Sequence, residues 1–304
     1  MTEDMKKSLN FFYNDEILEK YLEAGRTAST ILKESAQDIR IGRSYLDLVE
    51  SVEALVRERG ADLAFPLNVS LNEDAAHDTA SHGDERVFTK GDVVKLDLGV
   101  HLDGYIADTA TTIDLGSNAL LLEASEQALE SALKLVCPGA TSGELGSAIQ
   151  KEIESRGYRP ISNLTGHGLD RYIHHRQPAI PNVGISGGVV LEEGMVLAIE
   201  PFATTGSGHV GEKTRKEIYS QVSQKPVRIP AARTILEKVK NRQGLPFARR
   251  WLNEKKLDIT LPALVRSQVL HVYPVLSDIP GSLVSQHEHT LIVTADGCIV
   301  TTRW

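Results

Sequence analysis

The chain carries, between positions 93 and 108, the run Val93-Val94-Lys95-Leu96-Asp97-Leu98-Gly99-Val100-His101-Leu102-Asp103-Gly104-Tyr105-Ile106-Ala107-Asp108. An Asp-Gly pair between β-prone residues predicts a hairpin with a two-residue loop, and the alternating apolar residues give it one buried face. That loop places Asp108 opposite Gly99 and diagonally adjacent to Asp97. Diagonal neighbours lie roughly 7 to 8 Å apart at Cα, so the two carboxylates can share a cation. A three-residue loop would put them on opposite faces, and the plainer interpretation is a pair of solvated surface acids.

The composition is that of a globular protein with a sizeable core. The chain has 304 residues, 41% hydrophobic and 24% charged, enough for one large domain or two smaller ones. Its two cysteines, Cys137 and Cys298, are far apart in sequence, so they suggest neither a disulfide framework nor a thiolate zinc site, which fits a reducing cytosol. No apolar run approaches bilayer length, and the N-terminus does not resemble an export signal. We therefore expect a cytoplasmic protein without a membrane segment.

Charge is unevenly distributed along the chain. The net charge of −8 argues against the whole chain binding nucleic acid. Residues 213–256, however, hold thirteen Lys or Arg against three Glu, a local balance of +10. Such a segment can face an anionic partner, and the alternative is a solvated basic surface.

Helices and strands are expected to alternate. Helical apolar spacing over residues 15–58, interrupted at Gly42, predicts two helices, and residues 120–136 and 142–156 predict two more around Pro138-Gly139. Thr141 or Ser142 is suited to cap the fourth helix. Extended structure is expected over residues 64–113, 196–200 and 290–301. This order indicates an α/β or α+β fold with a largely antiparallel sheet.

Residues 210–272 have a different character. Ile235, Leu236 and Val239 share one helical face, Gly244 can end that helix, and a second helix can begin near Pro246. A third is expected over residues 260–270. The pattern predicts a compact, basic helical insertion at 210–272, within a core domain formed by residues 1–209 and 273–304.

Several acids and histidines stand in unusual places. Glu200 directly follows the apolar run 196–199, where a charge is costly unless it is paired or bound to a cation. Glu288 lies between His287 and His289 just before another apolar run, and His167 lies between two glycines. A strand-end Glu facing water and a loop His in a turn are the alternatives.

Together these residues form a set of ligands for hard cations. Asp97, Asp108, Glu200, Glu288 and His167 include no thiolate, which favours Mn, Fe, Co or Zn in a carboxylate-rich pair over a structural zinc. Five ligands leave too much charge for one ion, whereas two ions that share two bridging carboxylates balance it. Two metals roughly 3.5 to 4 Å apart catalyse hydrolysis by generating hydroxide and polarising the electrophile.

The order and spacing of these motifs resemble type II methionine aminopeptidases of the archaeal form, from about residue 15 to the C-terminus. The resemblance rests on Ala64-Phe65-Pro66, Ser70-Leu71-Asn72, Ala75-Ala76-His77, the two aspartate segments, Asn163-Leu164-Thr165-Gly166-His167, Ala198-Ile199-Glu200-Pro201-Phe202, Glu288-His289-Thr290 and the insertion segment 245–251. It implies the pita-bread fold, a curved antiparallel-rich sheet with outer helices.

The resemblance also implies roles for individual residues. Asp108 and Glu288 would bridge two divalent ions, Asp97 would chelate one, and His167 and Glu200 would hold the other. Glu200 would also carry a proton. His77 and His175 would act at the scissile bond, and the substrate pocket would include Phe65, His77, His174, His175 and Tyr273.

The implied activity is removal of the initiator methionine from nascent chains with a small second residue, by attack of a hydroxide held between the two metals. The expected protein is a monomer that meets nascent N-termini and contacts the ribosome through residues 213–256. Two alternatives are an Xaa-Pro peptidase and a non-catalytic relative that binds RNA or protein.

Four places depart from the family pattern, one of which is His287 where a Phe is usual. Asp78-Thr79-Ala80 follows His77 where Tyr-Thr-Pro is common, Arg176-Gln177 follows His175 where Ala-Gly is usual, and His174 replaces an aliphatic residue. These changes leave the ligand set intact and alter the polarity of the pocket.

Overall fold

The computed structural model describes residues 13–303. Its α-helices are α2 (Asp15–Asp38), α3 (Tyr45–Glu58), α4 (Ala119–Leu133), α5 (Ser142–Ser155), α6 (Pro230–Val239) and α7 (Leu257–Arg266). Two 3-10 turns are η1 (Lys240–Arg242) and η2 (Arg249–Trp251). The strands are β1 (Asp62–Leu63), β2 (Asn68–Leu71), β3 (Asp74–Ala76), β4 (Val93–Leu102), β5 (Tyr105–Asp114), β6 (Arg159–Pro160), β7 (Thr165–Asp170), β8 (Ile173–Pro181), β9 (Val196–Ile199), β10 (Phe202–Thr204), β11 (Gly211–Gln221), β12 (Phe247–Ala248), β13 (Leu270–Ser277), β14 (Val284–Gln286), β15 (His289–Thr294) and β16 (Gly297–Val300).

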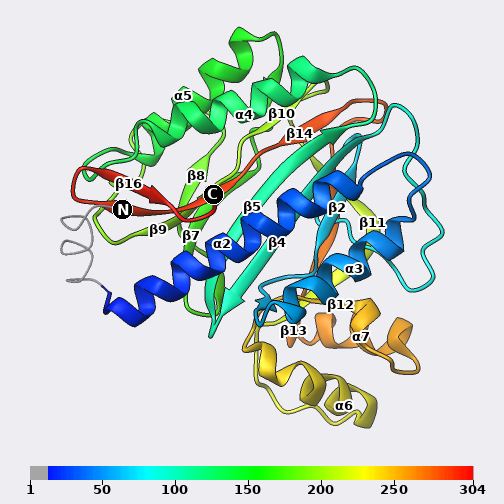
Figure 1. The fold of residues 1–304 in the computed structure, drawn as a ribbon. Helices are drawn as coiled ribbons and strands as arrows, with labels where there is room; N and C mark the ends of the chain where they lie inside the picture. Colours follow the sequence, from blue (N-terminus) through cyan, green and yellow to red (C-terminus); the bar gives the residue numbers. More distant parts are fainter. Residues whose placement is uncertain (1–12, 304) are drawn as a thin grey trace.

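Antiparallel sheets form the centre of the molecule, as the sequence predicts. The β4–β5 hairpin pairs with β1 and β2, while β16, β15, β9, β7 and β8 form a second sheet in that order. A bridge between Ala110 of β5 and Glu288 joins the two sheets. Figure 1 shows α2 along the hairpin and α4 and α5 over the other half, so helices cover the outer side of the strands.

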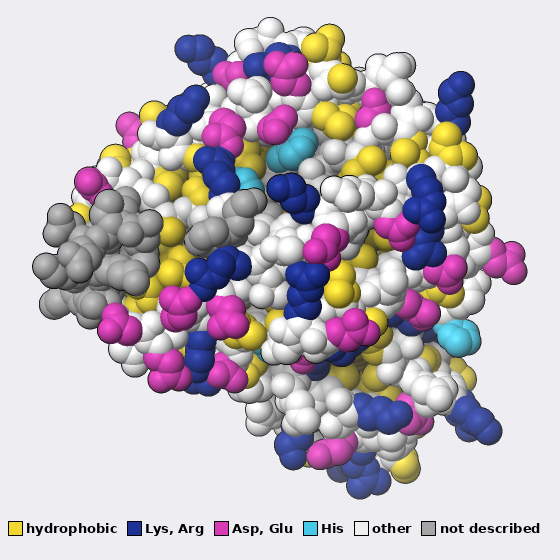
Figure 2. Space-filling view, viewed as in Figure 1, with side chains coloured by type: hydrophobic (Ala, Val, Ile, Leu, Met, Phe, Trp, Pro, Cys, Tyr) yellow, Lys and Arg dark blue, Asp and Glu magenta, His cyan; other side chains and the backbone are white. Residues whose placement is uncertain are grey.

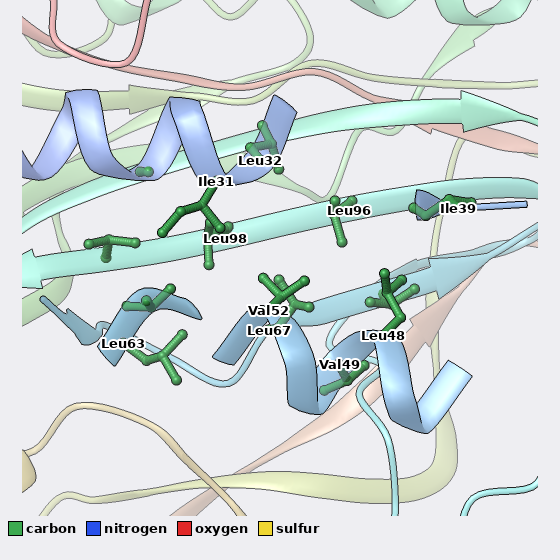
Figure 3. Packing of buried hydrophobic residues seen from close by; sticks show 14 of the residues in the cluster. Ile31, Leu32, Ile39, Leu48, Val49, Val52, Leu63, Leu67, Leu96 and Leu98 are labelled. Atoms are coloured by element: carbon green, nitrogen blue, oxygen red, sulfur yellow. The ribbon is translucent and has the colours of Figure 1, made fainter. Parts of the chain in front are cut away.

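The helices cover one face of the hairpin and leave the other free for a site. Leu96 and Leu98 of β4 are fully buried against α2 and α3, where Ile31 and Val52 meet them (Figure 3). Each such side chain contributes about 1.5–3 kcal/mol on burial. Because side chains alternate along a strand, this packing turns Asp97 to the opposite face.

The predicted helices are confirmed at the N-terminus and around Pro138-Gly139. Thr141 caps α5, and Glu144 completes a capping box by accepting from the Thr141 backbone N–H. Asn14 and Ser44 cap α2 and α3 through their side-chain oxygens, which accept from the backbone N–H groups of Ile17 and Asp47.

Residues 210–272 contain strands as well as helices. β11 pairs with β13 over most of its length, while α6 and α7 form a small lobe at the lower edge in Figure 1. The lobe has its own core, which includes Ile235 and Leu264.

The prediction of a helix that begins near Pro246 is wrong. That segment forms β12 and the 3-10 turn η2 instead. Phe247 pairs with Tyr219 of β11, and its side chain is buried. This strand pairing holds the backbone of residues 247–248 in an extended conformation. No helix within residues 13–303 has the length and apolar character that crossing a membrane requires.

Candidate metal centre

The hairpin places its two aspartates as its turn chemistry predicts. Leu102 pairs with Tyr105 and Gly99 with Asp108, so the loop is the two residues Asp103-Gly104. Both have positive φ, 51° and 89°, as a type I′ turn requires. Asp97 and Asp108 therefore lie diagonally on one face. Thr290 fixes the second of them, because its Oγ1 accepts from the Asp108 N–H at 2.8 Å and donates to the Asp108 carbonyl.

Two glutamates reach the same place from the second sheet. Glu200 follows the end of β9, and Glu288 immediately precedes β15, which pairs with β9. Glu288 is buried and is tied to the hairpin through its backbone bridge to Ala110. Glutamates that stand 88 positions apart in the sequence thus come to one site because their strands are neighbours.

His167 on β7 lies beside these carboxylates. Its Nε2 is 3.7 Å from Asp108 Oδ2 and 3.7 Å from Glu200 Oε1. Ligand atoms of Asp108, His167 and Glu288 lie within 4.8 Å of one another, close enough for one cation.

The other histidines and the aromatic residues line the remainder of the cavity. The rings of His174 and His175 on β8 lie 5.0 and 4.6 Å from that of His167. His77, at a positive φ of 64°, is 3.3 Å through Nδ1 from the Pro274 carbonyl, and its ring meets Tyr273 edge-on at 5.4 Å.

All ten residues that the sequence singled out line this one cavity, together with Asn68, Ala76, Ile218 and Pro246. The ten are Phe65, His77, Asp97, Asp108, His167, His174, His175, Glu200, Tyr273 and Glu288.

Sequence reasoning missed Gln286. Its Nε2 lies 3.4 Å from Asp97 Oδ2 and 3.5 Å from Glu200 Oε2, so it links acids of the two sheets. The sequence did contain a signal for Gln286. It stands two positions before Glu288, and in an extended segment such residues point to the same face.

Burial and crowding set the charge state of the acids. Burial, followed by repulsion from neighbouring carboxylates, raises the pKa values of Asp97, Glu200 and Glu288 well above the usual range. Burial raises the pKa of Asp108 to about 8. Among residues 13–303, no Lys or Arg forms an ion pair with any of the four. The cluster therefore lacks a protein countercharge.

Burial acts in the opposite direction on the histidines. It lowers the pKa of His77 to about 4 and that of His174 to about 3. The pKa values of His167 and His175 are likewise well below the ordinary range, with burial as the main cause. All four are neutral imidazoles at neutral pH, the form that binds metals.

These residues fit divalent cations. Asp97 Oδ1, Asp108 Oδ1 and Glu288 Oε1 are buried oxygens that have no hydrogen-bond partner in the part of the chain that the structure describes. Such atoms are costly to bury unless something binds them. An oxygen-rich set with one or more imidazoles suits Mn, Fe, Co or Zn.

Comparison with known proteins agrees with this chemistry. The family model described as "Metallopeptidase family M24" matches residues 19–233. The chain is 50% identical over 291 residues to the methionine aminopeptidase of Archaeoglobus fulgidus, covering 95% of this chain and 100% of that protein. It is 47% identical over 293 residues to the methionine aminopeptidase of Pyrococcus horikoshii, covering 94% and 99%.

Solved structures share the fold. The methionine aminopeptidase of Thermotoga maritima superimposes with a TM-score of 0.72 at 26% identity, covering 96% of this chain and 98% of that one. A thermophilic Arx1 superimposes with a TM-score of 0.87 at 21% identity, covering 96% and 92%. A Pyrococcus horikoshii prolidase gives 0.63 at 20% identity, and this chain covers 62% of it. These likenesses confirm the expected pita-bread fold.

Proposed function

The chain belongs to metallopeptidase family M24, and we propose that it is a metal-dependent aminopeptidase that removes N-terminal methionine from nascent proteins with a small second residue. The observation that carries the proposal is a group of four buried or half-buried carboxylates, unpaired with any Lys or Arg of residues 13–303, beside neutral histidines in one cavity. Relatives at 40–50% identity over nearly the whole chain are named methionine aminopeptidase.

Five residues would hold two divalent ions, Co, Mn, Fe or Zn. Asp108 and Glu288 would be shared by both ions, Asp97 would bind one ion, and His167 and Glu200 would bind the other. Bound ions of this kind lower the pKa of water and polarise a carbonyl group.

His77 and His175 would act at the scissile bond. Neutral His175 can donate an N–H to the carbonyl oxygen as negative charge develops on it. Neutral His77 turns Nδ1 to the Pro274 carbonyl, which can only accept, so Nδ1 carries the proton and Nε2 is left as an acceptor for an N–H of the substrate. Glu200 would take a proton at a carboxylate oxygen and deliver it to the leaving amine.

The apolar part of the cavity receives the methionine side chain. Phe65, Tyr273 and Ile218 line it, with His174 stacked on Phe65. A free α-amino group near Asp97 limits cleavage to the first residue. A cavity with little free space beside the scissile bond admits small second residues and excludes large ones.

The test is peptide cleavage after chelation and metal add-back, with Met-Ala, Met-Leu and Xaa-Pro peptides. We expect methionine release from Met-Ala alone, restored by added metal. A Glu288→Gln variant should lose at least about 100-fold in rate, the scale of losing one element of transition-state stabilisation. The exposed Glu212→Gln variant serves as the control.

Other outcomes would change the assignment. Cleavage of Xaa-Pro peptides would indicate a prolidase-like enzyme. No release with any of the four metals would favour a non-catalytic relative that binds RNA or protein.

We further propose that the enzyme is a cytoplasmic monomer whose 210–272 insertion contacts ribosomal RNA. Among the residues described, much of the basic charge is already paired with acids of the core. Arg215 contacts Asp78 and Asp84, and Arg250 contacts Glu53. Lys213, Lys238, Arg242 and Arg249 also have acidic partners. Figure 2 shows the resulting mixture of Lys, Arg and acids over the lower lobe.

The exposed Lys225, Arg228 and Arg233 have no ion pair within residues 13–303, so they are the better probes of ribosome contact. Reversing all three charges to Glu should abolish salt-sensitive cosedimentation with ribosomes. Reversal of Lys90, Lys134 and Lys151, exposed on the core, makes the same change in net charge and should leave binding intact. If both triple variants lost ribosome binding equally, net charge alone would explain the loss, and a specific contact through the insertion would be refuted.

A further inference from the structure

His174 lies against the carboxylate expected to bridge the two ions. Its Nε2 is 2.8 Å from Asp108 Oδ2. The ring is stacked on Phe65, with centroids 4.5 Å apart and planes 27° apart, which fixes its orientation.

The distances match those between ligands of one ion. Donor atoms about 2.0–2.2 Å from a cation lie roughly 3 Å apart when they bind at right angles. The separation of 2.8 Å between His174 Nε2 and Asp108 Oδ2 corresponds to such neighbours. His167 Nε2, at 3.7 Å from Asp108 Oδ2, fits the same ion at a wider angle.

The neighbouring imidazoles support the same placement. Ring nitrogens of His167, His174 and His175 lie within 4.8 Å of one another. Opposite ligands of one ion are separated by about twice the metal–ligand distance, roughly 4.2 Å. The spacing within 4.8 Å is that of a group that could hold one metal ion, so His174 and His167 can share an ion.

We propose that His174 is a second imidazole ligand, through Nε2, of the ion that His167 and Glu200 hold. This inference rests on the metal centre of the proposed function. It makes the two positions chemically unequal, since one has two nitrogen ligands and the other, at Asp97, only carboxylates. Imidazole favours zinc and cobalt, whereas carboxylates suit manganese.

The same geometry permits a weaker role, in which His174 only donates an N–H to Asp108. Two substitutions separate the roles. His174→Gln can keep an N–H donor near Asp108 but has no imidazole. His174→Ile removes both and retains apolar contact with Phe65.

The deciding measurement is a proton NMR spectrum of the cobalt-loaded protein with ¹⁵N-labelled histidine. A histidine that binds cobalt through Nε2 carries its N–H on Nδ1, which gives a strongly shifted, exchangeable signal. Among the described residues, His174 Nδ1 is buried and has no hydrogen-bond partner, and His167 Nδ1 faces the Gly168 carbonyl, so both protons are shielded from solvent. We expect two such signals in the unmodified protein and one in each variant.

Metal competition provides a second readout that is independent of activity. In both variants, zinc affinity at one site should fall at least ~100-fold, and manganese affinity by less than ~10-fold, since the lost ligand is nitrogen. His271→Ala removes a nearby exposed imidazole outside the cavity and should change neither affinity.

A single shifted signal in the unmodified protein, or equal loss of zinc and manganese affinity, would overturn the role of His174. If methionine release persisted alongside either result, the proposed function would stand and only this inference would fail. Failure of the unmodified protein to bind cobalt or zinc at all would overturn both.

Discussion

At the scale of single residues, Gly99 of the hairpin allows the Phe65 ring to pack close to the acidic cluster. Gly99 stands opposite Asp108, and a Cβ added there would lie 2.1 Å from the Phe65 ring. Phe65 in turn supports the His174 ring. The absence of a side chain at Gly99 is therefore what lets an aromatic ring pack beside the acids.

We expect Gly99→Ala to lower the free energy of unfolding by about 1–3 kcal/mol, because the ring or the strand must move. Gly297→Ala is the matched control, since Gly297 is also in a strand and its added Cβ would meet no atom of residues 13–303 within 4 Å. Urea denaturation of the metal-free proteins measures both. Equal urea midpoints for the two variants would show that the Phe65 ring does not restrict the size of the side chain at position 99.

At the scale of elements, a buried ion pair fastens the insertion to the N-terminal helices. Arg250 of η2 donates to both oxygens of Glu53 on α3, at 2.9 and 2.8 Å. Trp251 Nε1 donates to the same carboxylate at 2.7 Å. Glu53 is 2% exposed, so its charge depends on these partners.

Replacing Glu53 with Ala should destabilise the protein by about 3–5 kcal/mol, because Arg250 would remain buried without a countercharge. Glu58→Ala, on the exposed end of the same helix, should cost far less. Chemical denaturation of both variants is the measurement. A loss for Glu53→Ala no greater than that for Glu58→Ala would contradict the anchoring role.

At the scale of the whole molecule, the metal centre couples folding to pH. In the metal-free protein the folded pKa of Asp108, about 8, lies above its ordinary value, so the folded state binds the additional proton and loses stability as pH rises toward 8. Cations bind the ionised acids and displace that proton. Burial lowers the pKa of Lys95 to about 7, so Lys95 also titrates in this pH range. It titrates in both the metal-free and the metal-bound protein, so its contribution cancels from the difference between their unfolding free energies.

The stabilisation by a saturating divalent metal should therefore grow as pH rises from 6.5 to 8. The expected slope is about 1.4 kcal/mol per pH unit for each proton released. Unfolding free energies with and without manganese at both pH values check this. Below pH 6.5 the buried histidines, whose folded pKa values are lowered, also begin to favour unfolding. If the difference between the unfolding free energies with and without manganese stayed constant or fell toward pH 8, ionised acids could not be the ligands.

The sequence by itself determined the local features. Asp103-Gly104 dictates a type I′ turn, and with it the register that puts Asp97 and Asp108 on one face. Periodicity and capping residues placed the first four helices, and the order of motifs indicated the family. These features depend on neighbours in sequence, so local rules suffice to predict them.

Only the tertiary structure decided which distant side chains meet. It brought Gln286 to Asp97 and His174 to Asp108, and it neutralised Arg250 with Glu53. It also made an extended segment of residues 247–248, where a helix was predicted, because β11 supplied a pairing edge. Such contacts depend on packing between separate segments, which neither spacing nor composition encodes.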